Sequence, residues 1–144
     1  MANILSFNDF KFLIGETIGF CQTVEYDLKN IFAKVCEGDF EENFECVSRW
    51  TLGQIVTQME EYDNELEDKH FTNLEYRILR DMTKKRNYVC HEIFRTFAYT
   101  KEFLESNEYM MACNVVIDFH EDVVAVAKKI EQLRLNLGIS VYKK

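Results

Sequence analysis

Proline is absent from this chain of 144 residues, and glycine occurs only five times, whereas an average usage of about 5% would supply several prolines. A fold made of many short strands needs frequent turns, and proline and glycine are residues that turns commonly use. Their scarcity disfavours a many-turned β sandwich and favours a few long helices.

A disulfide framework is also missing. The five cysteines are odd in number and scattered, with no Cys-x-x-Cys pair and no metal-ligand spacing: Cys21, Cys36, Cys46, Cys90 and Cys113. Secreted disulfide-rich domains show a different pattern. The N-terminus lacks a basic segment followed by an apolar one, and no apolar run approaches membrane-spanning length. We expect a reduced, cytoplasmic protein with no membrane segment, no metal and no cofactor.

Positive charge is scarce: 17 lysine and arginine residues stand against 25 acids, which gives a formal net charge of −8. This balance argues against a general nucleic-acid binder. The cations are nevertheless concentrated. Residues 76–101 hold seven of them against two acids, a local charge of +5, which leaves −13 for the remainder of the chain. These cations are Arg77, Arg80, Lys84, Lys85, Arg86, Arg95 and Lys101.

What the chain does contain is material for a core, since 47% of its residues are apolar and 14% are aromatic. That composition excludes global disorder. The length suits one domain and is too short for two comfortable ones. We expect a single helical domain over residues 1–144.

Local patterns divide the chain into helices. Ser6 to Asp9 and the apolar spacing after them predict a first helix over residues 7–36, followed by an acidic loop over 38–48. Gly15 and Gly19 lie within that helix, where each costs about 1 kcal/mol relative to alanine. Either they allow close approach of a neighbouring helix, in this chain or in a second protomer, or they are tolerated small residues.

Two further capping boxes open the middle helices. Thr51 to Gln54 predicts a helix over residues 52–68, and Thr72 to Glu75 predicts one that either runs unbroken from 73 to about 104 or bends near 83–86. Ser106 or Asn107 begins a last long helix that stops at Gly138, and residues 139–144 are expected to fray. The sum is an all-α, up-and-down bundle of four to five helices.

The most informative stretch is Lys84-Lys85-Arg86-Asn87-Tyr88-Val89-Cys90-His91. It resembles the R-x4-6-H signature of the HEPN superfamily, through Arg86-Asn87, then His91, then Phe94 in a late helix of a small all-α domain. The resemblance implies a metal-independent endoribonuclease with Arg86 and His91 as the catalytic pair, and Asn87 as the polar residue that commonly follows the arginine. It also implies a homodimer whose two motifs line one cleft.

Many toxin-type members of that superfamily have tyrosine two places after the histidine, and this chain has Ile93 there. We therefore do not expect control by modification at that position. A toxin or antiviral-defence effector, with an antitoxin protein as a further partner, is the role that the resemblance implies.

The residue types suit this chemistry. RNA cleavage without a metal needs proton transfer, for which imidazole is suited near neutral pH, and a permanently charged fork for the phosphate, which arginine supplies. Lys84, Lys85 and Arg95 would then bind the RNA backbone. On an ideal helix, however, Arg86 lies about 140° around the axis from His91. Either the helix distorts at Arg86, or a partner protomer completes the site.

Other readings stay open. The same groove could belong to a non-catalytic helical module that binds RNA, a nucleotide or a protein, or the motif residues could be ordinary surface residues of a scaffold. Glu67-x-x-His70 matches half of a di-iron pattern without the second half. Glu25 is either a first-helix partner of the site or a solvated acid, and Cys90 is interpreted as a small core residue.

Overall fold

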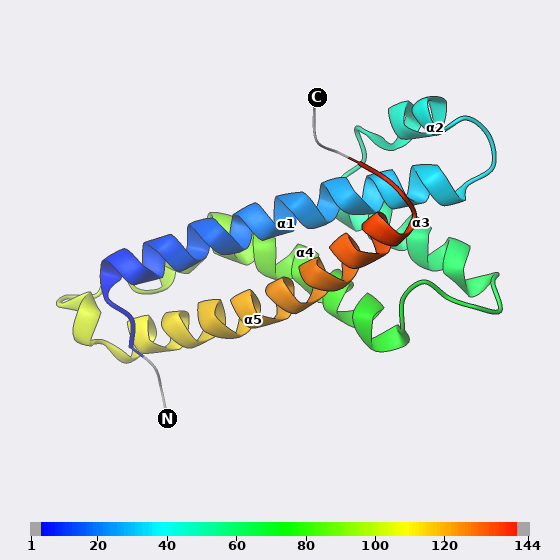
Figure 1. Ribbon diagram of the computed structural model, residues 1–144. Helices are drawn as coiled ribbons and strands as arrows, with labels where there is room; N and C mark the ends of the chain where they lie inside the picture. Colours follow the sequence, from blue (N-terminus) through cyan, green and yellow to red (C-terminus); the bar gives the residue numbers. More distant parts are fainter. Residues whose placement is uncertain (1–3, 141–144) are drawn as a thin grey trace.

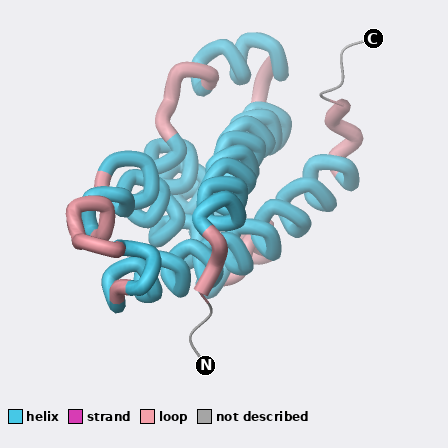
Figure 2. Tube along the Cα trace, turned by 90° about the vertical axis from the view of Figure 1, so that its left-hand side faces the viewer, coloured by secondary structure: helices cyan, strands magenta, loops and turns pink. Residues whose placement is uncertain are grey.

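The computed structural model describes residues 4–140, and this part of the chain forms five α-helices and no strand (Figure 1, Figure 2). The α-helices are α1 (Phe7–Val35), α2 (Phe40–Val47), α3 (Leu52–Asn64), α4 (Asn73–His91) and α5 (Asn107–Asn136). Two short 3-10 helices, η1 (Ile93–Thr96) and η2 (Phe103–Glu105), connect α4 to α5. The predicted all-α bundle is confirmed.

The two longest helices, α1 and α5, lie side by side and run in the same direction (Figure 1). Three contacts follow their length: the Tyr109 hydroxyl donates to the Leu5 carbonyl at 2.7 Å, His120 lies 2.8 Å from Glu16, and Arg134 lies 3.1 Å from Asp27. Helix α4 passes behind both and runs antiparallel to them. One buried apolar cluster draws on α1, α3, α4 and α5.

The predicted caps are present. The Ser6 hydroxyl accepts a hydrogen bond from the Asp9 amide, and the Ser106 hydroxyl accepts one from the Tyr109 amide. Thr51 with Gln54, and Thr72 with Glu75, form reciprocal capping boxes. Such bonds satisfy amide groups that have no partner within their own helix.

The acidic loop predicted over residues 38–48 is wrong, because most of it forms α2. Asp39 caps this helix by accepting a hydrogen bond from the Glu42 amide, and Glu41 and Glu42 lie at its positive end, where acids are stabilising. Its register is held by tertiary contacts. The Asn43 side chain donates to the carbonyls of Ala33, in the last turn of α1, and of Cys36, which follows it, and Val47 is buried.

Helix α3 ends at Asn64, four residues before the predicted end. The reason is the fully buried carboxylate of Asp63, which accepts hydrogen bonds from the Phe71 amide and the Tyr76 hydroxyl. His70 Nδ1 lies 2.6 Å from the same carboxylate. The chain must therefore turn back at once, and His70 belongs to this cluster rather than to a metal site.

Helix α4 continues without interruption through residues 83–86, but it ends at His91 rather than near residue 104. Beyond it, Phe94 and Phe97 pack against Phe10 at ring distances of 5.7 and 5.4 Å, and Phe103 packs against Phe7 at 5.4 Å. Because these rings surround the first turns of α1, the chain coils into short turns instead of continuing straight.

The end of α5 is as predicted, since Gly138 adopts the left-handed conformation (φ 73°) after Leu137. The prediction that the tail frays is wrong at Ile139, because this residue is buried and its carbonyl accepts a hydrogen bond from Arg134. Residues 141–144 of the predicted frayed tail lie outside the described residues. A Cβ at Gly15 or Gly19 would meet no atom of the described residues within 4 Å, so none of the described helices approaches them closely.

Candidate active site

Helix α4 presents the motif because its opposite face is locked in the core. Tyr76, Leu79, Met82 and Val89 are almost completely buried along it. With that face fixed, helical geometry decides where each motif side chain goes.

Arg86 points toward α1. Its guanidinium lies 3.6 Å from Glu25, and its side chain is only 25% exposed. The same Glu25 carboxylate lies 3.5 Å from the Lys29 ammonium group, which in turn donates to the Ser48 carbonyl at 3.0 Å. Arg86, Glu25 and Lys29 thus form a charged cluster (hereafter the Glu25 cluster) in which one carboxylate lies between two cations.

Glu25 is therefore a first-helix partner of Arg86 rather than a solvated acid. Lys29 was not singled out from the sequence, although one signal was available. Lys29 comes directly after Leu28, an apolar residue of α1. It also lies four residues after Glu25, and a spacing of four is typical of an ion pair within a helix. Lys29 is buried, with 8% of its side chain exposed.

His91 and Asn87 lie elsewhere on α4. Both are exposed, and His91 occupies the last residue of the helix. The helix is regular at Arg86, so the distortion that would bring Arg86 toward His91 within one chain does not occur. One protomer thus offers an inward arginine and an outward histidine.

The three predicted RNA-binding cations also separate. Lys84 is exposed, Lys85 lies 3.7 Å from Asp122 of α5, and Arg95, in η1, lies 3.5 Å from Glu92. Such exposed ion pairs contribute about 0–1 kcal/mol, so a phosphate can replace either carboxylate. The three side chains nevertheless do not share one face of α4.

Two cysteines lie near Arg86. Burial raises the pKa of the Cys21 thiol to about 12, the Arg86 charge opposes this rise, and Cys90 adds to it. Cys90 is exposed, so its interpretation as a core residue is wrong. It lies on a different side of α4 from His91, about 100° around the axis.

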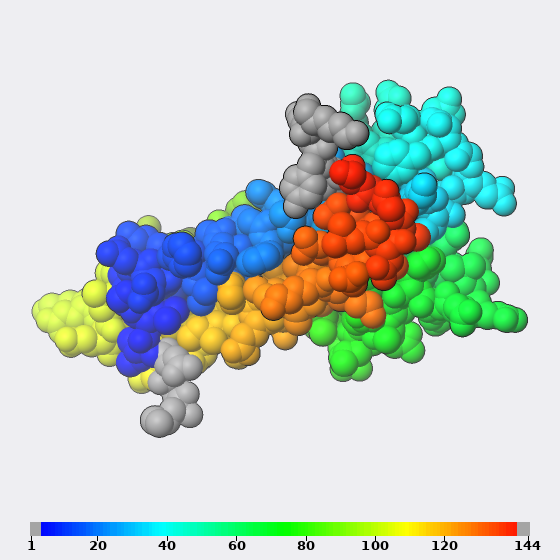
Figure 3. Space-filling view, viewed as in Figure 1, coloured from blue at the N-terminus to red at the C-terminus, as the bar shows by residue number. Residues whose placement is uncertain are grey.

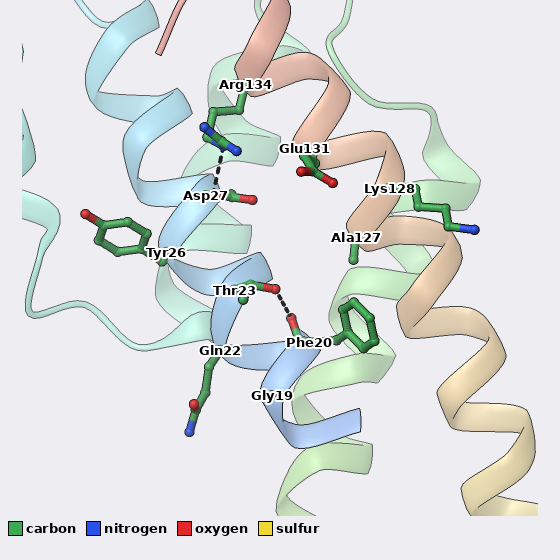
Figure 4. Close-up of a pocket in the computed structure, with 10 residues that line it drawn as sticks. All are labelled: Gly19, Phe20, Gln22, Thr23, Tyr26, Asp27, Ala127, Lys128, Glu131 and Arg134. Carbon is green, nitrogen blue, oxygen red and sulfur yellow. Dashed lines mark hydrogen bonds and ion pairs between the residues drawn. The ribbon is translucent and has the colours of Figure 1, made fainter. Parts of the chain in front are cut away.

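The motif does not border the hollow between α1 and α5, a groove of about 560 Å³ floored by small residues such as Gly19 and Ala127 (Figure 3, Figure 4). At one end Arg134 pairs with Asp27 at 3.1 Å, and their side chains are 4% and 13% exposed. Burial raises the pKa of the Asp27 carboxyl, Arg134 opposes the rise, and Glu131 adds to it.

The described residues contain no group of three or more histidine, cysteine, aspartate or glutamate side chains placed to hold a metal ion. Within the same part of the chain, no helix is both long and apolar enough to cross a membrane. No family model, curated protein or solved structure matches this chain.

Proposed function

We propose that this protein is a metal-independent endoribonuclease of the HEPN type that acts as a homodimer. The observation that carries the proposal is the arrangement on α4. Arg86 is held at a fixed position by Glu25, while His91 is exposed five residues later in the most cationic part of an acidic chain.

In the proposed reaction, the ribose 2′-oxygen attacks the adjacent phosphorus and the bond from phosphorus to the 5′-oxygen breaks. One proton leaves the 2′-hydroxyl and one is delivered to the 5′-oxygen, which gives a 2′,3′-cyclic phosphate and a 5′-hydroxyl. His91 is the proton-transfer group, and Arg86 stabilises the negative charge that gathers on the phosphate oxygens. Asn87 orients the phosphate or the imidazole.

The Glu25 cluster supports the role of Arg86. An arginine whose guanidinium is held by a carboxylate keeps its position before substrate arrives, which lowers the entropy lost on binding. Lys29 shares the same carboxylate, so Glu25 does not neutralise Arg86 alone. The cluster has one net positive charge when all three groups are ionised, and that charge is available to a phosphate.

A second protomer completes the site in this proposal. Since Arg86 and His91 face different directions on one α4, Arg86 of one protomer and His91 of the other would meet in a shared cleft. The resemblance extends the proposal to a toxin or antiviral-defence effector, with an antitoxin protein as the partner to seek.

Purified protein incubated with mixed RNAs in EDTA tests the proposal. We expect cleavage with cyclic phosphate ends, and a loss of at least about 100-fold in His91→Ala and Arg86→Ala, the range for removal of a general acid or base. His120→Ala and Arg49→Ala, which replace the same residue types outside α4, are the matched controls. Absent cleavage, or cleavage that persists in both motif variants, would overturn the proposal.

A non-catalytic module that binds RNA is the second candidate. It is favoured by the ion pair that occupies Arg86. Tight RNA binding by the wild-type protein without any new RNA ends would support it against the nuclease.

A further inference from the structure

One face of α4 carries a straight line of positively charged or protonatable side chains, made of Arg77, Lys84 and His91 (hereafter the outer stripe). These residues are seven apart, about two helical turns, so they lie nearly above one another. All three are exposed. The stripe is about 21 Å long at 1.5 Å per residue.

Within residues 4–140, the two permanent cations of the outer stripe differ from most of the neighbouring cations in making no ion pair. Of the seven cations in residues 76–101, Arg80, Lys85, Arg86 and Arg95 each lie within 4.0 Å of a carboxylate. Among the described residues, neither Arg77 nor Lys84 makes an ion pair, although acids outnumber cations by 25 to 17 in the whole chain. Unpaired cations aligned on one face of an acidic protein indicate a ligand with repeated negative charge.

We propose that the outer stripe binds the phosphate backbone of a single-stranded RNA segment that runs from the cleavage site at His91 toward Arg77. This inference rests on the proposed function and names its substrate class. The stripe length corresponds to about six phosphates of a stacked strand at 3.4 Å each.

A single strand fits this surface better than a duplex. Proteins recognise A-form duplexes through contacts that reach across a wide minor groove, whereas single strands follow a track of cations and stack bases on aromatic rings. The stripe is a single row on one helix, and one exposed acid, Asp81, lies beside it between Arg77 and Lys84.

The inference also changes which cations bind RNA. Lys84 keeps the role predicted from sequence, whereas Lys85 turns toward Asp122 on α5 and Arg95 toward Glu92. Arg77, which the motif does not include, takes their place, because helical geometry puts it in line with Lys84 and His91.

The test compares substrates of two lengths. Cleavage rates of a three-nucleotide and a twelve-nucleotide single-stranded RNA are measured for wild type and for Arg77→Glu, with Lys128→Glu as the matched control, since Lys128 is an exposed lysine of α5 outside the stripe. We expect the advantage of the long RNA in kcat/KM to fall about tenfold in Arg77→Glu, and its logarithmic salt dependence to decrease by about one unit. The Lys128→Glu control should keep both the length advantage and the salt dependence of the wild type.

Three results would overturn the inference: an unchanged length advantage in Arg77→Glu, an equal loss in Lys128→Glu, or competition by duplex RNA as strong as by single strands. If the wild-type protein cleaves no RNA, the proposed function fails, and the stripe is tested by binding alone. In that case, fluorescence anisotropy with the twelve-nucleotide RNA should show weaker binding and a reduced salt slope in Arg77→Glu; equal binding by both proteins would reject the stripe.

Discussion

The pKa of the Asp27 carboxyl is raised, whereas the pKa of an acid paired with a cation in a folded protein is usually lowered. The Asp27 carboxyl is removed from water between α1 and α5, and this burial raises its pKa more than the Arg134 charge lowers it. A charged group that is buried with imperfect compensation favours its neutral form. The pair therefore links the stability of the α1–α5 contact to pH.

The sign of that link can be tested. Because the folded state holds the Asp27 proton more strongly than the unfolded chain does, the stability from this group is present below the unfolded pKa and is lost as pH rises through the folded pKa. We expect the free energy of unfolding of wild type relative to Asp27→Asn to decrease from about pH 3.8 upward. Urea denaturation across pH 3.5–7 measures it.

Asp118→Asn, at an exposed acid of α5, controls for the loss of one charge. If wild type instead gains stability over Asp27→Asn as pH rises, then Arg134 outweighs burial and the interpretation of this pair is wrong.

At the scale of the element, local and distant interactions together set the ends and the rotation of α4. A capping box fixes its first residue, Asn73, and the aromatic rings around the start of α1 end it at His91. Between these two ends the buried face sets the rotation of the helix. The directions of Arg86 and His91 follow from that rotation.

The cap should contribute measurably. Thr72→Ala removes the hydroxyl that accepts the Glu75 amide bond, and we expect a loss of about 1 kcal/mol in the free energy of unfolding. Thr57→Ala, at an exposed threonine within α3, is the control and should change stability by less. Urea denaturation of both variants measures this difference. An equal loss of stability in the two variants would show that the capping box adds nothing beyond the loss of a threonine.

At the scale of the whole molecule, the proposed nuclease requires two copies of the chain. Mixing Arg86→Ala with His91→Ala, both inactive alone, should restore about a quarter of wild-type activity, because half of randomly paired dimers are mixed and each has one intact site of two. Activity titrated against the ratio of the two proteins measures this. Mixtures that stay inactive while forming mixed dimers would show that Arg86 and His91 act from the same chain.

The sequence by itself determined the all-α class, the starts of α1, α3, α4 and α5, and the stop at Gly138. Those signals act between residues three or four apart, so neighbouring side chains suffice to create them. It also placed Arg86 and His91 on one helix, about 140° apart. Tertiary contacts hold residues 40–47 against the end of α1 and end α3 early, since Asn43 and Asp63 satisfy groups from other parts of the chain. The Glu25 cluster and the pairing of Lys85 with Asp122 likewise depend on how α1, α4 and α5 pack together, because no local pattern specifies which helix faces each side of α4.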